Sequence, residues 1–158
     1  MEGKLDDHFP LVVWQKGSGT QTNMNANEVI ANRAIEIAGG ELGSKNPIHP
    51  NDDVNKGQST NNVFPSAIRL AALQLQRELD VNLEALIDAL DEKAAAFESV
   101  AKSGRTHLQD AVPVTLGQEF GAWARALAKA RSRIASAAES LLEIGVGGNA
   151  VGTGINTK

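Results

Sequence analysis

Residues 83–100 read LEALIDALDEKAAAFESV, and their apolar pattern decides the fold class. The apolar positions are Leu83, Leu86, Ile87, Leu90, Ala94, Phe97 and Val100. Because they recur every three or four residues, they lie along one face of an amphipathic helix. A face of this length has to be covered by other helices, so the stretch predicts packing in a helix bundle. Asp80 marks a candidate break before this helix, and Gly104 marks its end.

A second stripe of the same period follows it. Thr115 and Gln118 stand three residues apart at its start, which is the spacing of a capping box. Its apolar positions are Leu116, Phe120, Trp123, Leu127, Ile134, Leu141 and Ile144. We therefore expect two helices of roughly 25–30 residues, which is long for a small domain, with a loop over 105–114 between them. The glycine-rich segment 145–154 cannot continue the second helix.

The N-terminal part carries shorter helical signals. A helix is expected to begin near Asn25 or Asn27, which are good N-cap residues, and Gly39-Gly40 ends it. Residues 43–63 are polar and predict a loop. The next helix is expected to begin near Pro65, because proline suits the first turn of a helix.

Composition agrees with a helical protein. Hydrophobic residues make up 42% of the 158 residues, charged residues 22% and aromatic residues only 4%. Alanine and leucine supply most of the apolar content, which favours helix over sheet. We expect a mainly α-helical fold, a bundle of long helices with polar, glycine-bearing loops between them.

Composition also excludes several classes of protein. The net charge is -4 and no basic stripe is present, which argues against nucleic-acid binding. Cysteine is absent, so disulfides, thiolate zinc sites and cysteine nucleophiles are excluded. No apolar run approaches about 20 residues, so no membrane partner is expected. The mild acidity fits a cytoplasmic protein, and a processed protein of the mitochondrial matrix would look the same if the source is eukaryotic.

Two glycine-rich stretches need testing as nucleotide loops. Residues 17–20 lack the Lys-Ser/Thr ending of a phosphate-binding P-loop. Residues 145–150 fit G-x-G-x-x-A, but they follow a helix instead of a strand and no βαβ unit surrounds them. We reject both nucleotide interpretations.

Two polar segments offer hydrogen-bond donors. Residues 17–23 combine backbone N–H groups with hydroxyls such as Ser18 and Thr20, and could form an anion site or simply a turn before a helix cap. Residues 58–62 place five donor-capable side chains before a helix. The N-terminus of that helix would attract a carboxylate, although one of these residues could serve only as its cap.

Two histidines have polar neighbours. His49 precedes Asn51, Asp52 and Asp53, which reads as a solvated loop or as an incomplete metal site, because three ligands of proper geometry cannot be inferred from adjacent loop residues. His107 follows Thr106 and is a candidate general acid or base, since histidine titrates near neutrality. A structural role for His107 remains the alternative.

Taken in order, these segments resemble one family, the class II fumarases. The matching stretches are Trp14-Gln15, Gly17-Ser18-Gly19-Thr20-Gln21, Asn23-Met24-Asn25, His49-Pro50-Asn51-Asp52-Asp53-Val54-Asn55-Lys56, Gln58-Ser59-Thr60-Asn61, Gly104-Arg105-Thr106-His107-Leu108-Gln109-Asp110-Ala111, Thr115-Leu116-Gly117-Gln118-Glu119 and Ala150-Val151-Gly152-Thr153-Gly154. They cover nearly the whole chain in the family's order and spacing.

The resemblance implies a lyase that reversibly hydrates fumarate to L-malate in the tricarboxylic acid cycle, without metal or cofactor. It implies substrate binding by Ser18, Thr20, Ser59, Thr60, Asn61 and Thr106, water activation by His107, and a secondary carboxylate site at His49, Asn51 and Asp52. It further implies a homotetramer whose active sites draw on several subunits, with Thr106 and His107 supplied by another subunit.

The resemblance also sets the expected domain organisation. Residues 1–63 would be the end of an N-terminal domain with substrate-binding loops, and residues 64–158 the start of a central helical bundle. The chain looks incomplete at both ends relative to the family, and the family's serine base and Lys-Asn segment would lie beyond Lys158. We therefore expect the chain alone to be inactive.

Two other functions stay open. Ser59-Thr60-Asn61 is the form seen in the sister family, the aspartate ammonia-lyases, where fumarases usually have two serines, and Asn62 stands where fumarases usually have aspartate. The block at residues 17–22 favours fumarase. A non-catalytic helical oligomerisation module is the third reading, in which the polar loops would not converge on one pocket.

Overall fold

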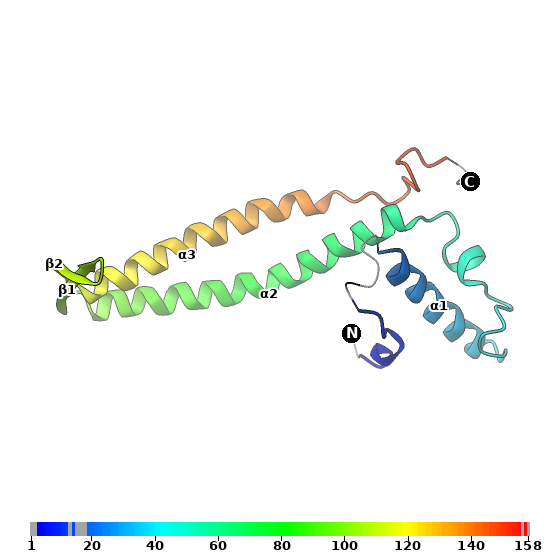
Figure 1. Ribbon diagram of the computed structural model, residues 1–158, viewed down its shortest axis with the longest axis horizontal. Coiled ribbons are helices and arrows are strands. Elements are labelled where there is room, and N and C mark those ends of the chain that lie inside the picture. Colours follow the sequence, from blue (N-terminus) through cyan, green and yellow to red (C-terminus); the bar gives the residue numbers. More distant parts are fainter. Residues whose placement is uncertain (1–2, 13, 15–18, 156, 158) are drawn as a thin grey trace. The chain divides into compact units, whose positions relative to one another are not determined.

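The structure is a computed structural model that describes residues 3–12, 14, 19–155 and 157. Figure 1 shows long helices and one small pair of strands, so the prediction of a mainly α-helical fold is confirmed. The main elements are α1 (Thr20–Ile37), α2 (Thr60–Ala96), β1 (Ala101–Thr106), β2 (Gln109–Thr115) and α3 (Leu116–Glu139). Short helical turns lie at Asp6–His8, Pro50–Val54 and Ser140–Leu142.

The chain forms two compact units. The first unit comprises Met1–Arg69 together with Glu143–Lys158, and the second comprises Leu70–Leu142. Helix α2 begins in the first unit and continues into the second. The expected domain boundary between residues 63 and 64 stays a prediction.

In the first unit, α1 begins earlier than predicted. Its first residue is Thr20, five residues before Asn25, because Gly19 takes a left-handed φ of 74° and its carbonyl accepts the Asn23 N–H at 3.0 Å. Gly19 is also packed so closely that a Cβ there would lie 2.3 Å from the Phe64 ring. A glycine cap thus replaces the asparagine cap that the sequence indicated. The predicted end holds, since Gly39 again has a φ of 74°.

Helix α2 also begins earlier than predicted, at Thr60 instead of near Pro65. Ser59 caps it, because its Oγ accepts the Asn61 N–H at 3.2 Å, and Asn62 Oδ1 reciprocates by accepting the Ser59 N–H at 2.9 Å. This arrangement resembles a capping box built with asparagine. Pro65 lies inside the helix, so its position misled the prediction of the start.

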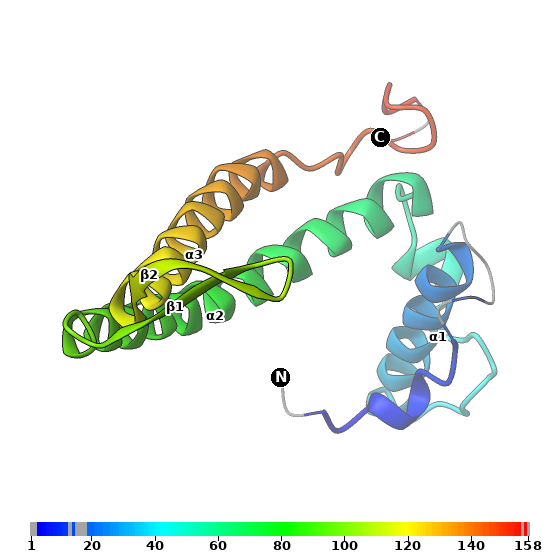
Figure 2. The same ribbon diagram turned by 60° about the vertical axis from the view of Figure 1, so that its left-hand side comes forward.

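The second unit contains the rest of α2 and the whole of α3, which run side by side in both views (Figures 1 and 2). The candidate break at Asp80 is wrong: α2 is continuous to Ala96, and the Asp80 carboxylate accepts two hydrogen bonds from Arg131 of α3, at 2.7 and 2.8 Å. Gly117 brings the two helices together, since a Cβ there would lie 2.4 Å from the Ala94 carbonyl oxygen.

The predicted loop over 105–114 is a β-hairpin, and α2 ends at Ala96 instead of Gly104. Strand β1 pairs antiparallel with β2, with an irregularity between Ser103 and Arg105. The strands were missed because Gly104 and Pro113 are unfavourable in sheets, although a two-stranded ribbon has edges that tolerate proline. The capping box that starts α3 is confirmed, with Thr115 and Gln118 each hydrogen-bonded to the other's backbone.

The described residues bury few side chains. Among them the buried hydrophobic residues are Ala31 and Ile35 in the first unit and Ala124 in the second. Large apolar residues of the second unit remain exposed, for example Leu75 at 64% and Val81 at 66%. No helix of the described part is long and apolar enough to cross a membrane.

Candidate functional site

The start of α2 gathers three of the predicted substrate-binding residues: Ser59, Thr60 and Asn61. Ser59 caps the helix, and Thr60 and Asn61 form its first turn. The first N–H groups of a helix have no partner within the helix, and the helix dipole adds partial positive charge there. The segment is therefore suited to a carboxylate, and its assignment to the substrate stays a prediction.

The Ser59 hydroxyl has a defined polarity. Its oxygen accepts the backbone N–H of Asn61 at 3.2 Å. A hydroxyl has one proton and two lone pairs, so an oxygen that accepts one hydrogen bond keeps its proton for donation elsewhere. Ser59 can thus cap the helix and donate to a ligand at once, and the two readings of residues 58–62 do not exclude each other.

The Thr60 hydroxyl oxygen also accepts a hydrogen bond, but from a side chain instead of the backbone. Asn23 Nδ2 of α1 donates to Thr60 Oγ1 at 2.9 Å. The same nitrogen lies 3.3 Å from Asn55 Oδ1, which also accepts from Asn27 Nδ2 at 2.9 Å. Asn23 and Asn27 are each only 7% exposed. These residues form a buried amide network that joins α1, the segment before α2, and the start of α2.

Asn61 connects α2 with the C-terminal segment of the first unit. Its Nδ2 donates to the Ala150 carbonyl at 2.8 Å, across 89 positions of sequence. The amide carries a second N–H that this bond does not use. A cavity of about 290 Å³ lies beside it, lined by Asn61, Asn62, Pro65, Arg69, Glu143, Ile144 and Gly145. The placement of the glycine-rich segment against α2 gave no signal in the sequence.

Thr20 is the predicted substrate contact of residues 17–23 that the structure describes. It is the first residue of α1, directly after Gly19, and its side chain is exposed. Ser18 lies outside the described residues. Three asparagines that the sequence analysis did not assign to the site, Asn23, Asn27 and Asn55, organise its interior. Their spacing in Asn23-Met24-Asn25-Ala26-Asn27, with asparagines four residues apart on one helix face, was the available signal.

His49 lies at the start of the short turn Pro50–Val54. Its Nδ1 accepts the N–H groups of Asn51 and Asp52, both at 3.2 Å. An accepting Nδ1 carries no proton, so the neutral ring is protonated at Nε2. Nδ1 is also 3.5 Å from the Asp52 carboxylate, a contact that becomes an ion pair only when Nδ1 gains a proton. The three predicted residues of the secondary site are therefore neighbours, with the ring's Nε2–H as the donor.

The metal reading of this loop finds no support. In the part of the chain that the structure describes, no group of three or more histidine, aspartate, glutamate or cysteine side chains could hold a metal ion.

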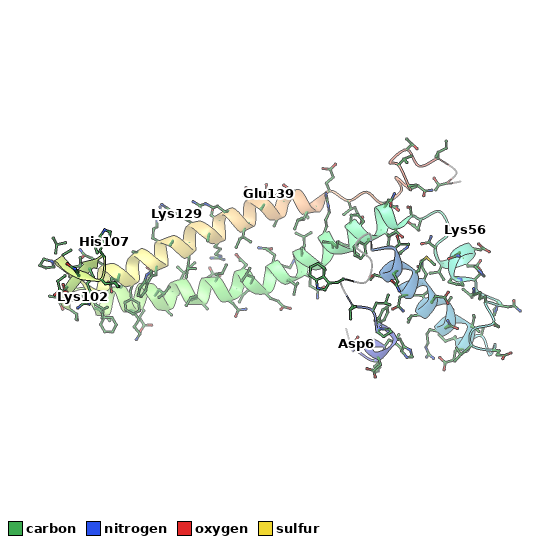
Figure 3. All side chains as sticks on the ribbon, in the orientation of Figure 1. Asp6, Lys56, Lys102, His107, Lys129 and Glu139 are labelled. Atoms are coloured by element: carbon green, nitrogen blue, oxygen red, sulfur yellow. The ribbon has the colours of Figure 1, made fainter. Side chains whose placement is uncertain are left out.

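Thr106 and His107 lie in the second unit, at the hairpin. Thr106 ends β1, and His107 with Leu108 forms the two-residue turn, at φ values of 51° and 63°. Positive φ at two consecutive residues is typical of the type I′ hairpin turn, which usually contains asparagine and glycine. Neither His107 nor Leu108 is such a residue, so the turn is strained. Figure 3 shows His107 on this hairpin.

Ion pairs hold the strands of the hairpin and its base. Arg105 Nε lies 3.0 Å from the Asp110 carboxylate, across the turn, and Lys102 Nζ lies 2.5 Å from Glu119 of α3. Leu108 is 98% exposed, and His107 is exposed as well. His107 is therefore accessible at the end of the two-stranded ribbon.

Comparison with known proteins shows the class to which this helical chain belongs. The chain belongs to the lyase family, whose model, described as "Lyase", matches residues 1–158. Its relatives include the mitochondrial fumarate hydratase of Rattus norvegicus, 60% identical over 99% of this chain and 31% of that protein. The class II fumarate hydratase of Brucella melitensis is 59% identical over 99% of this chain and 34% of that protein.

Solved structures agree with these relatives. A fumarate lyase:delta crystallin from Brucella melitensis matches with a TM-score of 0.90 and 51% identity, over 99% of this chain and 34% of that one. A class II fumarase from Schistosoma mansoni matches with a TM-score of 0.87 and 46% identity, over 99% of this chain and 33% of that one. The resemblance to class II fumarases is confirmed, and the chain spans about a third of the length of these relatives.

Proposed function

We propose that this chain is a segment of a fumarate hydratase, a lyase that interconverts fumarate and L-malate. The observation that carries the proposal is the start of α2, where the oxygens of Ser59 and Thr60 both accept hydrogen bonds from the protein and so keep their protons for a carboxylate. Membership of the lyase family and the names of the relatives support the same reaction.

The chemistry requires such donors. Removing a proton from the carbon next to a carboxylate places a second negative charge on that carboxylate. Donors already aimed at its oxygens stabilise this state more than the ground state, and that difference lowers the barrier. We assign this role to Thr20, Ser59, Thr60 and Asn61, with Ser18 as a further contact.

His107 is assigned the activation of water, with Thr106 as a neighbouring substrate contact. In the hydration direction a base has to take a proton from water, and a histidine is suited to this near neutral pH. The turn exposes His107, which is the access that a base needs. The resemblance implies that the reaction also needs a serine base that this chain does not contain, so the chain alone is expected to be inactive.

The assembly and the secondary site belong to the same proposal. The full-length protein is proposed to be a homotetramer in which Thr106 and His107 serve the donor residues of another subunit. His49, Asn51 and Asp52 would bind a second dicarboxylate through the ring's Nε2–H. We propose the cytoplasm as the compartment, or the mitochondrial matrix if the source is eukaryotic.

Aspartate ammonia-lyase is the second candidate, and the specific observation behind it is Thr60. Thr60 adds a methyl group to the cluster where fumarases usually have serine, and Ser59-Thr60-Asn61 is the form seen in that sister family. Both enzymes share the proton-abstraction step, so the geometry of the carboxylate donors fits either substrate.

The test uses the protein extended to the length of its relatives. Fumarate absorbance is followed with L-malate and then with L-aspartate as substrate. We expect malate to give the faster signal, and a faster signal from aspartate would replace the proposed function by the second candidate. The 158-residue chain, assayed at high concentration beside it, should give no signal with either substrate.

A further inference from the structure

Asn23 is buried beside Thr60, yet it is assigned no part in the chemistry by the family resemblance. Its Nδ2 donates to Thr60 Oγ1 at 2.9 Å, and Asn23 is only 7% exposed. The amide therefore cannot turn to solvent, and its contact with Thr60 is a fixed feature of the first unit.

The direction of this hydrogen bond decides what Thr60 can do. A threonine hydroxyl rotates freely unless a partner fixes it, and it can accept or donate. Because an N–H group cannot accept, the bond from Asn23 occupies a lone pair of Oγ1 and turns the hydroxyl proton away from α1. Thr60 is thereby kept as a donor, which is the state that binds a carboxylate.

Asn23 is itself oriented by two further asparagines. Asn55 Oδ1 lies 3.3 Å from Asn23 Nδ2 and accepts from Asn27 Nδ2 at 2.9 Å. Asn55 Nδ2 donates to the Gln58 carbonyl at 3.5 Å, which turns Asn55 Oδ1 toward the two amide nitrogens. A flip of Asn23 or Asn27 would then set oxygen against oxygen. The polarity of the network is therefore determined from Asn27 to Thr60.

We propose that Asn23 is a positioning residue of this enzyme, which fixes the Thr60 hydroxyl as a hydrogen-bond donor to the substrate carboxylate. This inference rests on the proposed function, because it takes Thr60 to be a substrate contact. It predicts that the chemical polarity of residue 23, beyond its size, determines how well a carboxylate binds.

The substitution Asn23→Asp tests polarity directly, because it replaces the donating amide by an acceptor of nearly the same shape. A carboxylate at residue 23 would accept a hydrogen bond from the Thr60 hydroxyl, which could then no longer donate to the substrate. We expect kcat/KM of the full-length protein to fall about 10–100-fold, the value of one hydrogen bond to a charged group. Asn23→Ala, which only frees the hydroxyl to rotate, should cost about 3–10-fold.

Matched variants separate positioning from damage to the fold. Asn25→Asp introduces the same charge on the same helix, where the amide donates to the His8 carbonyl and has no contact with Thr60. It is expected to leave KM within about twofold of wild type. The Asn23 substitutions are then repeated in a Thr60→Ala background, where a positioning residue has nothing left to position and should cost little further activity.

The outcomes are distinct. The positioning role would be overturned if Asn23→Ala lowered kcat/KM equally in the wild-type and Thr60→Ala backgrounds. It would also be overturned if Asn25→Asp lowered kcat/KM as much as Asn23→Asp does. Fumarate dissociation constants are measured beside the kinetics, so variants that bind without turnover still report on Thr60. If the wild-type protein deaminates aspartate and does not hydrate fumarate, the proposed function is wrong but the positioning role of Asn23 is still testable. The same set of Asn23 and Thr60 variants is then assayed with aspartate as substrate.

Discussion

The two units differ in how firmly their candidate site residues are held by other residues of the chain. In the first unit, Thr60 is fixed by a buried asparagine and Ser59 by the helix that it caps. In the second unit, His107 stands on an exposed turn with a positive φ, and the part of this unit that the structure describes buries little more than Ala124 and Gly117. The first unit thus fixes the hydroxyls of Ser59 and Thr60 through its own contacts, whereas the side chain of His107 is exposed among the described residues.

The largest expected effect tests the second unit. His107→Asn in the full-length protein should lower turnover about 10²–10⁴-fold, the usual contribution of a general base, while the melting temperature stays close to that of wild type. Steady-state kinetics with malate, together with thermal denaturation, checks this. Near-normal turnover would remove His107 from the mechanism.

The next effect tests the first unit. Gly19→Ala meets two penalties, a φ of 74° and a Phe64 ring 2.3 Å from the new Cβ, whereas Gly39→Ala meets only the same φ, with nothing within 4 Å. We expect Gly19→Ala to cost about 1–3 kcal/mol more stability than Gly39→Ala. It should also raise KM, since Thr20 adjoins it. Equal effects in the two variants would mean that the Phe64 contact does not constrain the site.

A matched pair in the second unit tests the packing of α2 against α3. A Cβ at Gly117 would lie 2.4 Å from the Ala94 carbonyl oxygen, but a Cβ at Gly121 would lie 3.7 Å from the Ala94 side chain. Gly117→Ala should lower the free energy of unfolding by about 1–3 kcal/mol, because the Ala94 backbone cannot move aside as the end of a side chain could. Gly121→Ala should be neutral or stabilising by up to about 1 kcal/mol through helix propensity. Chemical denaturation of the full-length protein measures both.

A smaller change in stability, on substitution of Leu108, tests whether the hairpin turn is packed in the complete protein. Leu108 has a φ of 63° and is 98% exposed, so Leu108→Gly should stabilise the isolated chain by up to about 1 kcal/mol. Leu108→Ala, which keeps the φ penalty, should not. In the full-length protein we expect Leu108→Gly to destabilise, through lost packing. The same stabilisation in both settings would show that the turn stays exposed.

The smallest effect concerns pH. Hydrogen bonds from Arg131 lower the pKa of Asp80 below its ordinary value. A carboxyl with a lowered pKa contributes stability that is complete above its unfolded pKa, about 4, and that is lost as the pH falls through the folded value. Asp80→Asn should therefore make stability less sensitive to acid below about pH 4. Asp88→Asn, at an exposed position of α2, is the control, and an identical acid response of both variants would contradict this role of Asp80.

The sequence predicted those features whose cause is local. The apolar spacing of residues 83–97 and the Thr115–Gln118 capping box indicated both long helices. Features that depend on distant residues were missed. Asp80 indicated a candidate helix break, and the local pattern could not show its partner Arg131, which is 51 positions away. The hairpin is local, and the sequence predicted a loop there because its strands contain Gly104 and Pro113.

The candidate site shows the same division. The types of residues 58–62 and their place before a helix indicated a donor segment or a helix cap, and the resemblance to the class II fumarases implied Ser59, Thr60 and Asn61 as substrate contacts. The residues that orient them were not assigned, because Asn23 meets Thr60 across 37 positions and Asn61 meets Ala150 across 89. Residue type thus indicates what a side chain can do, and only the fold shows which state it is held in.

We propose that the first unit supplies the hydrogen-bond donors for the substrate carboxylate and that the second unit supplies the base for the same reaction. Mixing two full-length variants tests it most directly: Thr60→Ala, which lacks a donor, and His107→Asn, which lacks the base. If the two roles come from different subunits of a homotetramer, subunit exchange should restore roughly a quarter of wild-type malate dehydration, the share expected from independent assortment. A mixture that exchanges subunits, as shown by mass, but stays as inactive as its components would show that Thr60 and His107 do not serve one active site across subunits.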